Sequence, residues 1–190
     1  RFNVTSSNSE KEIDGTSNLN DSQWHHLTAV YTPSTSLKVY VDGALEATNT
    51  SSIPASLDND SVNFVVGAEA DAELLFQGNI DEVAIWDTAL DATAIGKIGS
   101  KVVDLTKYSA SNLKLWLRAG DKVLPESDAS IARSDFYTDF DGTDDYVDAG
   151  TTMGTALGDN YAGSLTTCFW FKADVTSGDD GLFNIGNFSG

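Results

Sequence analysis

The chain has 190 residues, of which 29 are acidic and 11 basic, so its formal net charge is −18. A surface this negative repels phosphate backbones and anionic lipid, and it argues against nucleic-acid partners. Hydrophobic residues form 41% of the sequence, enough for a buried core. No apolar run reaches the roughly 18 residues that indicate a membrane span, so no membrane insertion is expected. The lone Cys168 excludes an intramolecular disulfide, and a start at Arg1 predicts a processed product or a window from a longer chain.

Strand signals dominate the first half of the chain. Residues 23–31 are rich in β-forming side chains and end before Pro33. Residues 37–45 continue the pattern, and Asp42-Gly43 supplies the residue types that a two-residue hairpin turn requires. Further strands are predicted at residues 44–49, 62–67 and 76–86.

The remainder of the chain offers one short helix and more strands. Asp91 is a good N-cap for a helix over residues 92–98, and Gly99 is a natural stop. Strand-like segments resume at residues 113–118, 136–140, 145–147, 165–172 and 182–185. Many short strands with turn residues between them predict an all-β fold, an antiparallel two-sheet jelly-roll sandwich with one short helix.

Several segments together resemble the laminin G-like (LamG-like) members of the concanavalin A-like lectin/glucanase superfamily. Residues 24–31, 37–43 and 78–86 are similar to segments of the C-terminal half of that domain. Residues 113–118, 140–147, 165–173 and 182–186 are similar to segments of its N-terminal half. The resemblance therefore implies that the two halves occur in reversed order.

The reversed order divides the chain into residues 1–100, a connector at 101–111, and residues 112–190. Three origins fit: a cut from a tandem array, a circular permutant, or a subunit that exchanges half-domains with its neighbours. Isolated half-sandwiches would expose apolar faces and strand edges to water. We therefore expect the halves to complete one sandwich, within the chain or with a neighbouring copy, which brings residues 1 and 190 close together.

One acidic motif invites a catalytic interpretation. Retaining glucanases of the superfamily carry Glu-x-Asp-x-Glu on one strand, where alternation puts the carboxylates on one face. Glu69, Asp71 and Glu73 have this spacing, but alanines separate them and the resemblance places them in a loop. We interpret the motif as an acidic loop and predict a protein that is not an enzyme. Glycoside hydrolysis ranks last among the functions.

Calcium is the metal that the sequence favours. His25 and His26 are neighbours that point to opposite faces of a strand, so they cannot share one metal ion. Residues 141–145 concentrate carboxylates at a turn, and the resemblance implies that this turn lies near the strand of Asp81. We predict Ca²⁺ ligands at Asp141, Asp144 and Asp81. The alternative is that these are turn-forming aspartates.

No ligand-binding residue is assigned from the sequence. The four tryptophans lie in strand signatures, where burial is the default, and Tyr161 and Phe188 in loops are freer candidates. The resemblance implies a non-enzymatic binding or adhesion module that recognises a glycan or a surface protein, with structural calcium, in an extracellular, cell-surface or virion-surface setting. The alternative is a structural assembly subunit, such as a phage capsid decoration, fibre or filament, whose partners are copies of itself.

Overall fold

The computed structural model describes residues 1–6, 9–57, 65–68, 75–101, 103–118, 137–148, 157, 161–174 and 183–184. These residues form the mostly β architecture that the sequence predicts, with antiparallel sheets and a single α-helix, α1 (Ala92–Ile98). The strands are β1 (Phe2–Ser6), β2 (Ser9–Ile13), β3 (His25–Thr32), β4 (Ser36–Val41), β5 (Ala44–Asn49), β6 (Val65–Val66), β7 (Gln77–Trp86), β8 (Leu113–Leu117), β9 (Thr138–Asp141), β10 (Val147–Asp148), β11 (Leu165–Ala173) and β12 (Phe183–Asn184).

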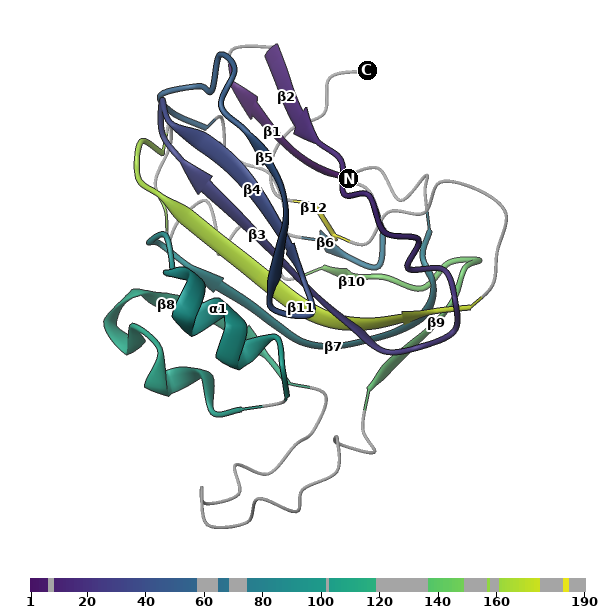
Figure 1. The fold of residues 1–190 in the computed structure, drawn as a ribbon. Helices are drawn as coiled ribbons and strands as arrows, with labels where there is room; N and C mark the ends of the chain where they lie inside the picture. The colour runs from purple at the N-terminus through teal and green to yellow at the C-terminus, as the bar shows by residue number, and fades with distance from the viewer. Residues whose placement is uncertain are drawn as a thin grey trace.

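The largest sheet interleaves strands from both halves of the chain (Figure 1). Its order is β5-β4-β3-β11-β7-β8, and β9 also pairs with β7. Strand β11 comes from the second half, yet it pairs with β3 through Leu165 and Tyr31 and with β7 through Thr166 and Trp86. One chain therefore completes this seven-stranded sheet by itself. Residue 190, whose distance from residue 1 was predicted to be short, lies outside the described residues.

The inner face of the seven-stranded sheet carries the larger core. Alternate residues of β3 and β11, including Tyr31 and Phe169, pack there because successive side chains on a strand point to opposite faces. The hairpin β1–β2 and the three-stranded sheet β10-β6-β12 lie on this side, and Phe2 and Val66 join the same cluster. This two-layer packing is the expected sandwich.

A β-bulge in β7 keeps the apolar side chains on both sides of the bulge facing this core. Two steps along β11, from Cys168 to Trp170, correspond to three steps along β7, so β7 holds one extra residue. Glu82 occupies the bulge with φ +53°, a left-handed conformation that non-glycine residues adopt infrequently. The extra residue lets Ile80 and Val83, three positions apart, both face the inner core.

The outer face of the sheet is covered at one end by α1 and the segment after it (Figure 1). Ile95 and Ile98 of the helix pack with Trp86 in a second apolar cluster. Asp91 caps the helix as predicted, because its carboxylate accepts a hydrogen bond of 2.8 Å from the Ala94 amide. The connector adds Leu105 and Tyr108 to the same cluster.

Glycines let the helix approach the β4–β5 turn. Asp42 and Gly43 have φ +49° and +80°, the left-handed pair that the predicted hairpin turn needs. Gly99 ends the helix in a right-handed conformation, so it is not the left-handed stop that glycine often provides. A Cβ on Gly99 would lie 2.4 Å from the Gly43 amide nitrogen. Gly99 is therefore required for close contact between helix and turn.

The hairpin β1–β2 was not predicted from the sequence. Phe2, Val4 and Ile13 are buried, but polar residues separate them and the segment contains few β-branched side chains. Its register pairs Phe2 with Ile13, so the hairpin is stabilised by packing on the inner core. Such tertiary packing overrides weak local propensity.

Candidate functional site

Two of the three predicted calcium ligands lie together in one exposed turn. Carboxylate oxygens of Asp141, Asp144 and Asp145 lie within 4.8 Å of one another. The turn follows β9, which pairs with the first residues of β7. Two of these carboxylates also shape the turn: Asp141 accepts from the Thr143 amide at 2.8 Å, and Asp145 accepts from the Asp141 amide at 3.1 Å. The donors are of the kind that Ca²⁺ prefers.

The third predicted ligand lies elsewhere. Asp81 is on β7 four residues beyond Gln77, the partner of Asp141, which corresponds to about 13 Å along the strand. Asp81 is 7% exposed, and its carboxylate accepts a hydrogen bond of 2.8 Å from the Glu82 amide at the bulge. The structure thus groups Asp145 with Asp141 and Asp144, and not Asp81. The sequence signal for Asp145 was its position in the acidic run of residues 141–145.

Next to Asp81, the β-bulge directs the Glu82 carboxylate toward the outer face. The Trp116 indole N–H donates to the carboxylate of Glu82, which is only 3% exposed. The Arg118 guanidinium lies 4.6 Å from the centre of the Trp116 ring, and its Nε is 3.7 Å from Glu82 Oε1. A cation, an aromatic ring and a buried anion therefore stabilise one another at this end of β8.

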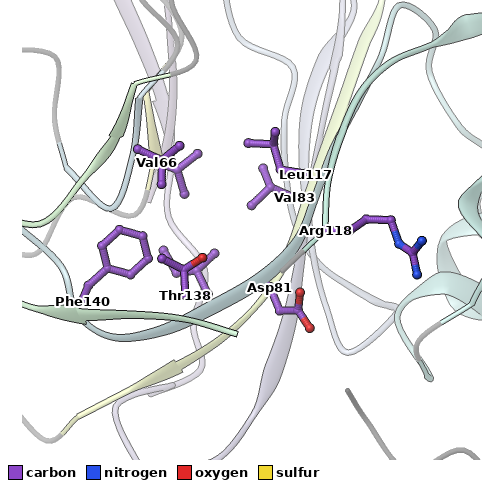
Figure 2. A pocket seen from close by; sticks show the side chains of 9 residues that line it. Val66, Asp81, Val83, Leu117, Arg118, Thr138 and Phe140 are labelled. Atoms are coloured by element: carbon purple, nitrogen blue, oxygen red, sulfur yellow. The ribbon is translucent and has the colours of Figure 1, made fainter. Parts of the chain in front are cut away.

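A cavity of about 230 Å³ lies between the sheets on the other side of β7 (Figure 2). Figure 2 shows Val66 and Phe140 facing Val83 and Leu117 across it, while the charged ends of Asp81 and Arg118 point away from these apolar groups. The full lining is Val66, Ile80, Asp81, Val83, Leu117, Arg118, Thr138, Phe140 and Val147. The cavity belongs to the apolar core, and of the predicted site residues Asp81 lines it whereas Asp141 and Asp144 do not.

The two histidines point to opposite faces, as predicted, and their pKa values move in opposite directions. Burial lowers the pKa of His26 to about 4, and its ring packs 5.0 Å from that of Trp170. Burial also opposes the charge on His25, but hydrogen bonds to Asp42 at 2.9 Å and Asp21 at 3.2 Å outweigh it and raise the pKa of His25. His25 therefore ties the segment before β3 to the β4–β5 turn.

Of the two loop candidates for ligand binding, only Tyr161 lies among the described residues, and it is less free than the sequence suggested. Tyr161 is half-buried, packs against the inner core and donates to the Ser164 carbonyl at 2.8 Å. Phe188 and the motif of Glu69, Asp71 and Glu73 lie outside the described residues. Cys168 is buried, which raises the pKa of its thiol and fits a core residue.

Sequence reasoning missed two tyrosines. Tyr137 and Tyr146 are 46% and 49% exposed, and they flank β9 on either side. Among the described residues, Leu45 at 55% is the other large apolar side chain with such exposure. Both tyrosines lie in segments predicted as strands, residues 136–140 and 145–147, but β9 is only four residues long and neither residue lies within it.

Comparison with known proteins identifies the family of this fold. Within the described part of the chain, no helix is long and apolar enough to cross a membrane. No curated protein and no solved structure matches the chain. A family model of laminin G type, described as the concanavalin A-like lectin/glucanases superfamily, matches residues 1–96, half of the chain. The match covers the strands from β1 to β7 and α1 as far as Gly96, and the order of the two halves stays a prediction. The chain belongs to the concanavalin A-like lectin/glucanase superfamily.

Proposed function

We propose that this chain is a non-enzymatic extracellular binding module that recognises a glycan or a surface protein. Laminin G-like domains are typically extracellular, and they are usually binding modules without enzymatic activity. The observation that carries the proposal is the completion of the family sheet within one chain, where β11 fills the position between β3 and β7. A complete sandwich presents ordered surfaces for ligand recognition.

Because β11 already fills the sheet of its own chain, we rank assembly by half-domain exchange second. An exchanged segment from a neighbouring copy would have to displace β11, which contributes Phe169 and Phe171 to the inner core. Displacing these side chains would expose a large apolar area to water. We therefore favour ligand binding over a polymer built by strand exchange.

The test is a binding screen with the full chain on immobilised glycans and on extracellular-matrix proteins. We expect saturable binding to at least one of them, and we expect a bound oligosaccharide to be recovered intact after prolonged incubation. Hydrolysis of the oligosaccharide would favour the glucanase interpretation of Glu69, Asp71 and Glu73. Concentration-dependent polymers that bind nothing in the screen would favour the assembly subunit.

Calcium at the acidic turn stays a prediction, and the same preparation tests it. Calcium titration of the chelator-treated chain should give saturable heat and a higher unfolding temperature, because the folded state alone holds the three carboxylates together. Asp144→Asn combined with Asp145→Asn should abolish both effects. A chain whose unfolding temperature does not respond to calcium would leave these residues as turn-forming aspartates.

A further inference from the structure

The cavity between the sheets lies beside a break in the seven-stranded sheet. Strand β11 pairs with one edge of β7 along almost its whole length, so β8 and β9 share the other edge. On that edge β8 ends with Leu117 opposite Val83, and β9 begins with Thr138 opposite Ile80. Leu117 and Thr138 both line the cavity, and Thr138 is exposed. The cavity therefore opens to the surface between the ends of two strands.

The cavity is larger and more apolar than an ordinary gap in packing. Its volume is about 230 Å³, whereas an engineered apolar cavity of about 150 Å³ stays dry and binds benzene. Val66 and Phe140 face Val83 across it (Figure 2). Water in such a space needs polar partners, and the described lining offers one hydroxyl, that of Thr138. Because an unfilled space leaves its lining atoms without contacts, an apolar molecule that fills it stabilises the fold.

The walls of the cavity are held in place by their own neighbours. The Phe140 ring packs against Phe76 with a centroid distance of 6.4 Å and an interplanar angle of 64°. A Cβ on Gly67 would lie 2.3 Å from Phe140 Cε1, so the ring also rests on the backbone at this glycine. On the opposite wall, Val83 belongs to a strand that is paired on both edges, and its branched side chain has few rotamers. The space is therefore preformed, and binding in it requires little rearrangement.

The charged residues of the lining direct their charged ends away from the apolar space (Figure 2). The Asp81 carboxylate accepts a hydrogen bond of 2.8 Å from the Glu82 amide. The Arg118 guanidinium lies over the Trp116 ring, and its Nε is 3.7 Å from Glu82 Oε1. A carboxylate on a ligand would lose its hydration here and would lie near two protein carboxylates. These surroundings favour a neutral ligand.

We propose that this cavity binds a neutral, mainly apolar small molecule of about the size of a substituted benzene, with at most one polar group. The apolar body of the ligand packs between Val66 and Phe140 on one wall and Val83 and Leu117 on the other. Its polar group lies at the opening, where the Thr138 hydroxyl can donate a hydrogen bond to it or accept one. This site lies inside the sandwich, so it is separate from the surface recognition proposed above.

The experiment uses the full chain and three probes that share a para-isopropylphenyl body and differ only at the opposite end of the ring. para-Cymene carries a methyl group there, para-isopropylbenzyl alcohol a hydroxymethyl group, and para-isopropylbenzoate a carboxylate. Calorimetry measures the affinity for each probe, and thermal unfolding is followed with and without it. We expect the hydrocarbon and the alcohol to bind and to raise the unfolding temperature, because only the folded chain holds the cavity. The carboxylate should bind at least tenfold more weakly.

Variants of the lining locate the bound probe. Val83→Phe fills the cavity from β7 and should weaken binding of the hydrocarbon at least tenfold without lowering the unfolding temperature of the free chain. Thr138→Val keeps the side-chain shape, so it should weaken binding of the alcohol at least threefold and leave the hydrocarbon within twofold. The matched control is Val39→Ala, at a core valine that is 3% exposed and does not line the cavity. It should lower the unfolding temperature and leave both affinities within twofold.

Circular dichroism confirms that each variant is folded, and if Val83→Phe does not fold, the two affinities of Thr138→Val decide the outcome. Failure of both neutral probes to bind overturns the proposal, and the proposed surface recognition is then unaffected because its own screen tests it. Binding of the carboxylate as tightly as the alcohol overturns the neutral ligand class. Neutral probes that bind the folded Val83→Phe chain as tightly as the parent chain lie elsewhere, which overturns the site.

Discussion

The two faces of the seven-stranded sheet are stabilised by different kinds of interaction. The inner face is apolar from β3 to β8 and is sealed by the smaller sheets. The outer face carries its apolar cluster under α1. Beyond the helix it buries His26, Asn79 and Glu82, each of which must be satisfied by a partner. The inner face therefore supplies most of the stability, and the outer face carries the groups whose positions depend on charge and hydrogen bonds.

The largest effect should come from the inner face. Phe169→Ala removes a side chain that is 1% exposed at the centre of β11, and it should lower the free energy of unfolding by about 4 kcal/mol. Urea unfolding followed by tryptophan fluorescence measures the loss. Leu45→Ala, at a side chain that is 55% exposed, should change stability by less than about 0.5 kcal/mol. Equal losses from the two variants would contradict the core assigned to this face.

The buried histidine of the outer face should make the protein sensitive to acid. Since the pKa of His26 is about 4 when folded and 6.5 in the unfolded chain, only the unfolded chain takes up this proton between those values. Stability should therefore fall as the pH drops from 6.5 to 4, by about 3 kcal/mol from this group. The measurement is the difference between parent and His26→Gln unfolding energies across that range. A difference independent of pH would refute the burial of a neutral imidazole.

The neighbouring histidine should show the opposite trend. The folded pKa of His25 is raised, so its stabilising effect is complete below the unfolded value of 6.5 and is lost as the pH rises through the folded value. His25→Gln should consequently cost more stability at pH 5 than at pH 8. Asp42→Asn removes one partner and should reduce that pH dependence. A cost for His25→Gln that grows with pH would exclude the ion pairs with Asp21 and Asp42.

The buried carboxylate at the bulge gives a smaller effect. Trp116→Phe removes the N–H that donates to Glu82, a hydrogen bond to a buried charge, and should cost about 2 kcal/mol. Because the substitution also changes packing, a double-mutant cycle with Glu82→Gln isolates the interaction. Strictly additive losses would show that the two side chains do not stabilise each other.

The smallest effect concerns the helix that covers the apolar part of the outer face. Asp91→Ala removes the hydrogen bond to the Ala94 amide and should cost about 1 kcal/mol. Asp91→Ser keeps a capping oxygen and should recover most of this loss in the same thermal unfolding measurement. Failure of serine to recover stability would assign the effect to something other than capping.

Local sequence patterns predicted the strands, helix and turn that are stabilised by residues adjacent in the sequence. Runs of β-forming side chains predicted β3, β4, β7 and β11, and α1 has the predicted bounds because Asp91 caps it within one turn. Asp42-Gly43 predicted the tight turn because few other residue pairs adopt two successive left-handed conformations. The β1–β2 hairpin escaped prediction because its packing partners lie far away in the sequence.

The sequence by itself determined the strands other than β1 and β2, the helix, the turn and the acidic run of residues 141–145. Only the tertiary structure decided that Tyr137 contacts Trp24 and that Asp145, not Asp81, lies beside Asp141. It also decided that the pKa of His25 is raised while that of its neighbour His26 is lowered. The physical reason is that local propensity acts between neighbours in the chain. Strand order, register and the bulge at Glu82 set contacts between residues that are far apart in sequence.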